Sequence, residues 1–273
     1  MNTREEKLQA FGRLLDVLDE LRVKCPWDRK QTNESLRPNT IEETYELCDA
    51  LMKHDDANIC KELGDVLLHV CFYAKIGSEH GAFDMADVCN HLCDKLIFRH
   101  PHVFPPEGQA QADVNTAQAV SEQWELLKQK EKDGNKTVLS GVPDALPALI
   151  KAYRIQDKAR NVGFDWEDRT QVWDKVKEEI SEFEVEAKQG NQDDMEKKFG
   201  DVMFSLINAA RLYKINPENA LEKTNRKFIR RFNYLEAHTL KQGCQLTDMS
   251  LAEMDEIWNE AKKAERAEDA GNQ

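Results

Sequence analysis

The chain has 273 residues, 33% of them charged, and its formal net charge is −13 at pH 7. This length fits two domains, and the acidic charge argues against non-specific nucleic-acid binding, which requires a basic surface. No segment approaches the ~18 consecutive apolar residues of a membrane span, and the N-terminus lacks the apolar region of a signal peptide, so we expect a cytoplasmic protein.

Helices are expected along nearly the whole first half. Apolar residues recur there with the 3.6-residue period of amphipathic helices, and no segment shows the convincing two-residue alternation of strands. The expected helices lie near residues 5–23, 40–53, 57–80 and 84–99. Asp84 and either Asn39 or Thr40 are plausible N-caps, because short polar side chains can accept from the free N–H groups of a first helical turn.

Two pairs of carboxylates stand out on the two central helices of this half. Glu43 and Glu46 form one pair and Glu62 and Asp65 the other, each spaced three residues apart. Residues three apart lie on one face of a helix, so two antiparallel helices would aim all four carboxylates at one point. Four oxygen ligands suit a hard divalent cation such as Mg²⁺, and such a site can support metal-assisted phosphate chemistry.

The residues after Asp65 argue against a merely solvated acidic face. Residues 66–73 are apolar on nearly all sides of the helix, so this helix should be buried. Glu62, Asp65 and His69 share one narrow stripe on it. Two like charges about 4 Å apart repel by roughly 4 kcal/mol at an effective dielectric constant near ~20, and a bound cation would relieve that repulsion.

The second half is expected to repeat this helical organisation after a linker. Residues 105–117 are rich in Gln, Ala, Pro and Gly and are predicted to be a linker, followed by a short amphipathic helix near 118–132. The expected helices of the second half lie near residues 147–160, 169–189, 194–213, 217–240 and 249–268.

The carboxylate motif occurs twice. At a constant offset of 136 residues, the counterparts of Glu43, Glu46 and Asp65 are Glu179, Glu182 and Asp201. This repetition indicates a tandem duplication. We therefore predict an all-α fold with two tandem duplicated four-helix-bundle-like domains, made of a first repeat at 1–104, a linker with a short helix at 105–146, and a second repeat at 147–273.

One ligand position differs between the repeats. Lys198 stands where the first repeat has Glu62, and a protonated lysine donates hydrogen bonds but cannot ligate a metal. The second site is therefore expected to bind Mg²⁺ only weakly. Lys198 could instead form a salt bridge with Glu179 or Asp201, or hold a phosphate.

These motifs resemble the MazG family of nucleoside triphosphate pyrophosphohydrolases, within the all-α NTP pyrophosphatase superfamily. The resemblance covers almost the whole chain and is carried by Cys25-Pro26-Trp27-Asp28 and residues 40–46, 62–65, 99–104, 161–166 and 227–232. It implies hydrolysis of NTPs or dNTPs to monophosphate and pyrophosphate with Mg²⁺, for which Mn²⁺ could substitute. It also implies a role in housecleaning or nucleotide-pool control, and a homodimer.

Within such an enzyme the first repeat offers further candidate residues. Glu42 or Glu43, if not fully used as a ligand, could accept a proton from the attacking water. Lys95 and Arg99 lie four apart on one helix face and could clamp the phosphates; the alternative is a solvated basic face near a helix C-terminus. Trp27 could stack on the base or could pack under its loop.

The second repeat supplies its own candidates for phosphate and base contacts, which are Lys175, Lys227, Arg231 and Trp258. For Trp258 the alternative is packing of the apolar face of the terminal helix. Trp166 has the same two readings as Trp27, base stacking or packing under a loop.

Two other functions stay open from the sequence. The same scaffold could serve a narrower substrate, such as dUTP, dCTP or a phosphoribosyl-nucleotide. The chain could also be a nucleotide-sensing or protein-interaction module with little turnover, which Lys198 favours for the second repeat. The intact carboxylates of the first repeat predict that residues 23–104 carry most of the hydrolysis.

Overall fold

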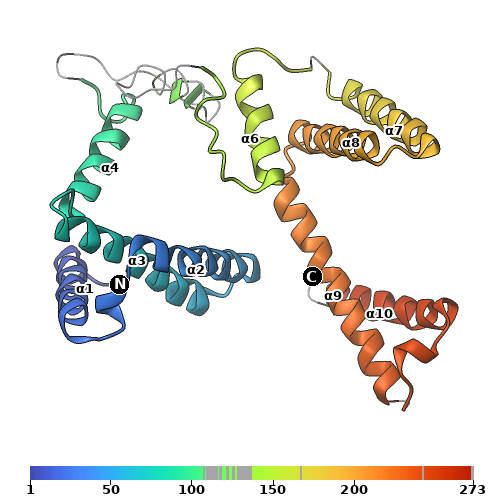
Figure 1. The fold of residues 1–273 in the computed structure, drawn as a ribbon, viewed down its shortest axis with the longest axis horizontal. Helices are drawn as coiled ribbons and strands as arrows, with labels where there is room; N and C mark the ends of the chain where they lie inside the picture. The colour runs from blue at the N-terminus through green and yellow to red at the C-terminus, as the bar shows by residue number, and fades with distance from the viewer. Residues whose placement is uncertain are drawn as a thin grey trace. The chain divides into compact units, whose positions relative to one another are not determined.

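The computed structural model describes residues 1–106, 137–166, 168–241 and 243–271, with isolated positions between 107 and 136 (Figure 1). These residues form an all-helical fold without strands, and they include no helix that could span a membrane. The chain divides into two compact units, residues 1–120 and 121–273. Most of the linker and of the short helix predicted near 118–132 lies outside the described residues.

The first unit is built around a helical hairpin. Its helices are α1 (Arg4–Lys24), α2 (Asn33–Lys53), α3 (Asp56–Glu79) and α4 (Met85–Arg99). Helices α2 and α3 lie side by side, and α1 and α4 both contact α3 (Figure 1). The expected helices near 5–23, 57–80 and 84–99 are confirmed, as is Asp84 as an N-cap.

The start of α2 was predicted wrongly. The helix begins at Asn33 rather than near residue 40, so neither Asn39 nor Thr40 is its N-cap. The cap is Thr32, whose hydroxyl accepts from the Ser35 N–H at 3.2 Å while Ser35 Oγ accepts from the Thr32 N–H at 2.9 Å. This reciprocal capping box starts the helix early enough to place a proline inside its second turn.

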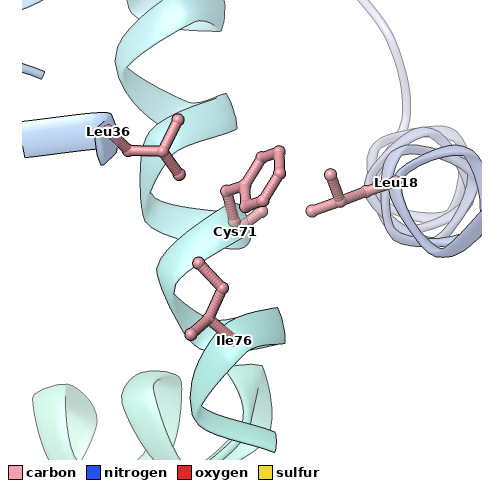
Figure 2. Close-up of a cluster of buried hydrophobic side chains, with 5 residues drawn as sticks. Leu18, Leu36, Cys71 and Ile76 are labelled. Atoms are coloured by element: carbon pink, nitrogen blue, oxygen red, sulfur yellow. The ribbon is translucent and has the colours of Figure 1, made fainter. Parts of the chain in front are cut away.

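A small apolar core orients the hairpin. Leu18 of α1 and Leu36 of α2 pack against Cys71, Phe72 and Ile76 of α3, and each of these side chains is at most 4% exposed (Figure 2). Leu36 precedes Glu43 by seven residues, which is about two helical turns. Burial of Leu36 against α3 therefore also turns Glu43 towards α3.

Helix α4 leaves its large apolar side chains uncovered within one chain. Leu92, Leu96, Ile97 and Phe98 are each 42–48% exposed, and none of the residues of α4 is fully buried. Exposed large apolar side chains in this number are typical of a surface that another chain covers.

The second unit repeats the hairpin. Its helices are α6 (Ala148–Arg160), α7 (Gln171–Gln189), α8 (Gln192–Leu212), α9 (Pro217–Lys241) and α10 (Leu251–Gly271). Helices α7 and α8 pack together, α6 lies against α8, and α9 pairs with α10 (Figure 1). All five helices expected in this half are confirmed.

The turn of each hairpin has the same backbone conformation. His54 ends α2 with φ of 55° and Gly190 ends α7 with φ of 76°, both in the left-handed region. The two residues are 136 positions apart, the same offset as the carboxylates. The equivalence of this turn supports the tandem duplication independently of the carboxylate motifs.

Candidate metal and active site

Three of the four predicted ligands of the first repeat converge. Glu43 of α2 and Glu62 and Asp65 of α3 each present a carboxylate oxygen, and these oxygens all lie within 4.8 Å of one another. Glu46 is outside this group. It lines an adjoining cavity of about 430 Å³ together with Glu42 and Glu62. We name the group of Glu43, Glu62 and Asp65 the carboxylate cluster.

Glu62 is the least solvated member of the carboxylate cluster. It is only 2% exposed, and its Oε1 accepts from Lys61 Nζ at 2.8 Å. Its Oε2 is buried and has no hydrogen-bond partner among the described residues. An unpaired buried carboxylate oxygen is energetically costly, and a cation at this point would give it a partner.

The charges of the cluster act on one another. Burial, followed by the negative charges of Asp65, Glu46 and Glu62, raises the pKa of Glu43 above its usual value. Lys61 offsets part of this charge, with its Nζ 3.7 Å from Asp65 Oδ2. Because the Lys61 side chain is 63% exposed, it can turn into solvent and leave the carboxylates to another cation.

The donor set fits a hard divalent ion. All three converging side chains offer oxygen, and no thiolate or imidazole belongs to the group. Oxygen ligands of this kind are preferred by Mg²⁺ and Mn²⁺ over softer metals. The cluster therefore has the composition expected of a magnesium or manganese site.

A hydroxyl network fixes the hairpin next to the cluster. Thr40 Oγ1 of α2 lies 3.0 Å from His69 Nδ1 and 2.5 Å from the Tyr73 hydroxyl, both on α3. Thr40 precedes Glu43 by three residues and His69 follows Asp65 by four, so the network lies about one turn from the ligands. From the sequence Thr40 was expected at a helix end, and its hydrogen bonds to α3 were not predicted.

Lysines pair with the carboxylates of the second repeat. Lys198 Nζ lies 2.5 Å from Glu182 Oε2 and 3.7 Å from Asp201 Oδ2, which confirms the predicted salt bridge to Asp201. Glu179 Oε1 pairs instead with Lys175, at 2.8 Å, while its Oε2 is buried without a hydrogen-bond partner among the described residues. The hydrogen bond to Glu182 raises the pKa of Lys198 above its usual value, so the lysine stays charged at neutral pH.

Three predicted substrate-binding residues of the first repeat lie outside the hairpin. Lys95 and Arg99 are on α4, and Trp27 is 58% exposed in the loop that precedes the short 3₁₀ helix Asp28–Lys30. Their assignment to phosphate and base contacts stays a prediction.

The candidates on α9 and α10 contact each other. Arg231 Nη2 lies 2.6 Å from Glu265 Oε2, and its guanidinium lies 6.0 Å from the centre of the Trp258 ring. The Phe228 and Trp258 rings are 5.1 Å apart between centroids. This geometry is the packing alternative considered for Trp258. Lys227 is also on α9, and Lys175 is paired with Glu179. Their contacts to the substrate stay predictions.

Comparison with known proteins places both hairpins in one family. The MazG nucleotide pyrophosphohydrolase domain matches residues 31–104 and 168–235, so each matched segment contains one carboxylate motif. The chain is 40% identical over 265 residues to a nucleoside triphosphate pyrophosphohydrolase of Escherichia coli K12, covering 94% of this chain and 99% of that protein.

Two further relatives agree with this match. A nucleoside triphosphate pyrophosphohydrolase/pyrophosphatase MazG of Thermotoga maritima is 42% identical over 255 residues, covering 92% of this chain and 95% of that protein. The Bacillus subtilis protein YabN is 45% identical over 269 residues, covering 96% of this chain and 54% of that protein.

Proposed function

Because the chain belongs to the MazG nucleotide pyrophosphohydrolase family, we propose that it hydrolyses nucleoside triphosphates to monophosphate and pyrophosphate at the carboxylate cluster. The observation that carries the location is the buried, unpartnered Oε2 of Glu62 within a convergent group of three carboxylates. We assign the hydrolytic repeat to residues 1–104, the linker to 105–146 and the second repeat to 147–273.

The chemistry follows from the side chains of the first repeat. A divalent cation held by Glu43, Glu62 and Asp65, with Glu46 close by, would neutralise phosphate oxygens and acidify a bound water. Glu42 is exposed beside the cluster and, with Glu43, is the candidate acceptor of the proton from the attacking water. Lys95, Arg99 and Trp27 are the candidate contacts to the phosphates and base.

A product assay tests this function. Incubation of the full chain with several NTPs and dNTPs and Mg²⁺ should release pyrophosphate and monophosphate, and a chelator should abolish the release. Orthophosphate as the first product would contradict the proposal. Activity confined to dUTP or dCTP would support the narrower substrate class, whereas nucleotide binding without turnover would support a sensing module.

The exposed apolar side chains of α4 support a dimer. We propose a C₂ homodimer in which each unit pairs with its own copy, since this closed symmetry is the commonest for soluble oligomers. Pairing would cover Leu92, Leu96, Ile97 and Phe98, which one chain leaves 42–48% exposed. Light scattering should give twice the chain mass, and a strict monomer at micromolar concentration would refute the dimer.

A further inference from the structure

A cavity in the second unit is lined by none of the repeated carboxylates. It lies between α6, α8 and the loop that follows α6, and its volume of about 510 Å³ falls in the range of small-molecule sites. Most of its lining is apolar. The residues that define it are Ile155, Gln156, Phe164, Trp166, Phe204 and Asn208.

Gln156 brings an unpaired acceptor to this cavity. The residue is 6% exposed, and its Nε2 donates to the Phe204 carbonyl at 2.8 Å. Because a carbonyl only accepts, this contact fixes the orientation of the amide. The remaining atom, Oε1, is buried and has no hydrogen-bond partner in the described parts of the chain.

Asn208 brings a donor. Its Oδ1 accepts from Arg211 Nη2 at 2.8 Å and from Arg211 Nε at 3.2 Å. A guanidinium only donates, so the oxygen must face Arg211 and the amide nitrogen faces away from it. The cavity therefore combines a buried acceptor and an amide donor with three aromatic rings.

The charges of the cavity favour an uncharged ligand. Arg211 and Asp165 both line it, but they are bound to each other through two hydrogen bonds, one of them 3.0 Å from Nη1 to Oδ2. Phe204 follows Asp201 by three residues on α8, so the cavity adjoins the carboxylates of the second repeat. There, the three carboxylates are paired with two lysines, so neither these lysines nor Arg211 offers an uncompensated positive charge to a phosphate.

We propose that this cavity binds an uncharged nucleoside. The base would stack against Phe164 and Trp166, donate an N–H to Gln156 Oε1 and accept from Asn208 Nδ2. Base–aromatic stacking is strong and tolerant of sequence. The choice of nucleosides among planar heteroaromatic compounds rests on the proposed function, because that activity acts on molecules containing the same bases.

Calorimetric titration of the full chain with adenosine, guanosine, cytidine and uridine tests the site. With chelator present, at least one nucleoside should bind with one site per chain, and Glu62→Gln should bind it with unchanged affinity. This variant separates the two proposals, because it removes the hydrolytic site and leaves the cavity intact. A failure of pyrophosphate release would leave this titration unaffected.

Two variants examine the contacts without disturbing the fold. Phe164 is 81% exposed, so Phe164→Ala should weaken nucleoside binding about ten-fold by loss of stacking while the chain stays folded. Asn208→Asp keeps the acceptor for Arg211, removes only the donor, and should also weaken binding. Leu251→Ala is the matched control, because Leu251 is likewise 81% exposed but lies on α10.

Three results would overturn the proposal. One is that none of the four nucleosides binds. Another is that Phe164→Ala and Asn208→Asp bind as tightly as the parent chain. The third is that these variants lose the dimer in light scattering, which would make the cavity a contact between two copies.

Discussion

Replacement of Glu62 by glutamine should lower NTP hydrolysis by about 100-fold or more without lowering the melting temperature. A cation that polarises a phosphate is worth several kcal/mol of transition-state stabilisation, and ~1.4 kcal/mol corresponds to ten-fold in rate. Glutamine keeps the shape of Glu62 and an acceptor for Lys61, but it removes the charge from the cluster. Pyrophosphate release and thermal unfolding, measured on the same preparation, give both quantities.

The melting temperature of the Glu62→Gln variant distinguishes a functional role of Glu62 from a structural one. Glu62 is 2% exposed, and loss of a buried structural ion pair would destabilise the chain strongly. In the metal-free protein, however, Glu62 is repelled by Glu43 and Asp65, so its neutralisation should hold or raise the melting temperature. Asp65→Ala should likewise cost far more activity than stability.

Asp56→Asn is the control for the Glu62 variant. It removes the same charge from the first turn of the same helix, α3, but Asp56 lies outside the carboxylate cluster. It should therefore leave hydrolysis close to the parent level. A Glu62→Gln chain that unfolds at a much lower temperature, or one that keeps its activity, would show that Glu62 is not a cation ligand.

Spacing alone predicted the core of this site. The separation of three residues between Glu62 and Asp65, and the apolar residues that follow, required one buried helix face. The duplication required two hairpins, and His54 and Gly190 turn both of them through the left-handed conformation. These features depend on helical periodicity, which a sequence displays directly.

Contacts between side chains could not be predicted in the same way. The helix start at Asn33 was not predicted, and only the contact between Thr32 and Ser35 reveals the capping box. The hydrogen bonds of Thr40 to α3 and the choice of Glu182 as the nearest partner of Lys198 depend on rotamers and on the helix crossing. Periodicity fixes the face on which a residue lies, but not the atom that it contacts.

The two repeats should differ sharply in activity. Glu62→Ala should abolish hydrolysis, whereas Asp201→Ala should leave most of it, because in the second repeat Lys198 occupies a ligand position and binds Glu182 and Asp201. Lys61 also contacts carboxylates in the first repeat, but it does not stand at a ligand position. Its side chain can turn into solvent while all the ligands stay in place. Lys198 replaces a ligand. Loss of activity in Asp201→Ala with an active Glu62→Ala would reverse the assignment.

Lys198→Glu should therefore create a second cation site. The substitution changes the local charge by two units and restores the pattern of Glu43, Glu46, Glu62 and Asp65 at the equivalent positions. Calorimetric titration with Mn²⁺ should show one tight site per parent chain and two per Lys198→Glu chain. Lys197→Glu is the matched control, because Lys197 is the neighbouring residue and pairs with Asp194 outside the ligand set. An ammonium group held among these carboxylates must be displaced before a cation can bind them. Two tight sites already present in the parent chain would therefore mean that Lys198 does not exclude the metal.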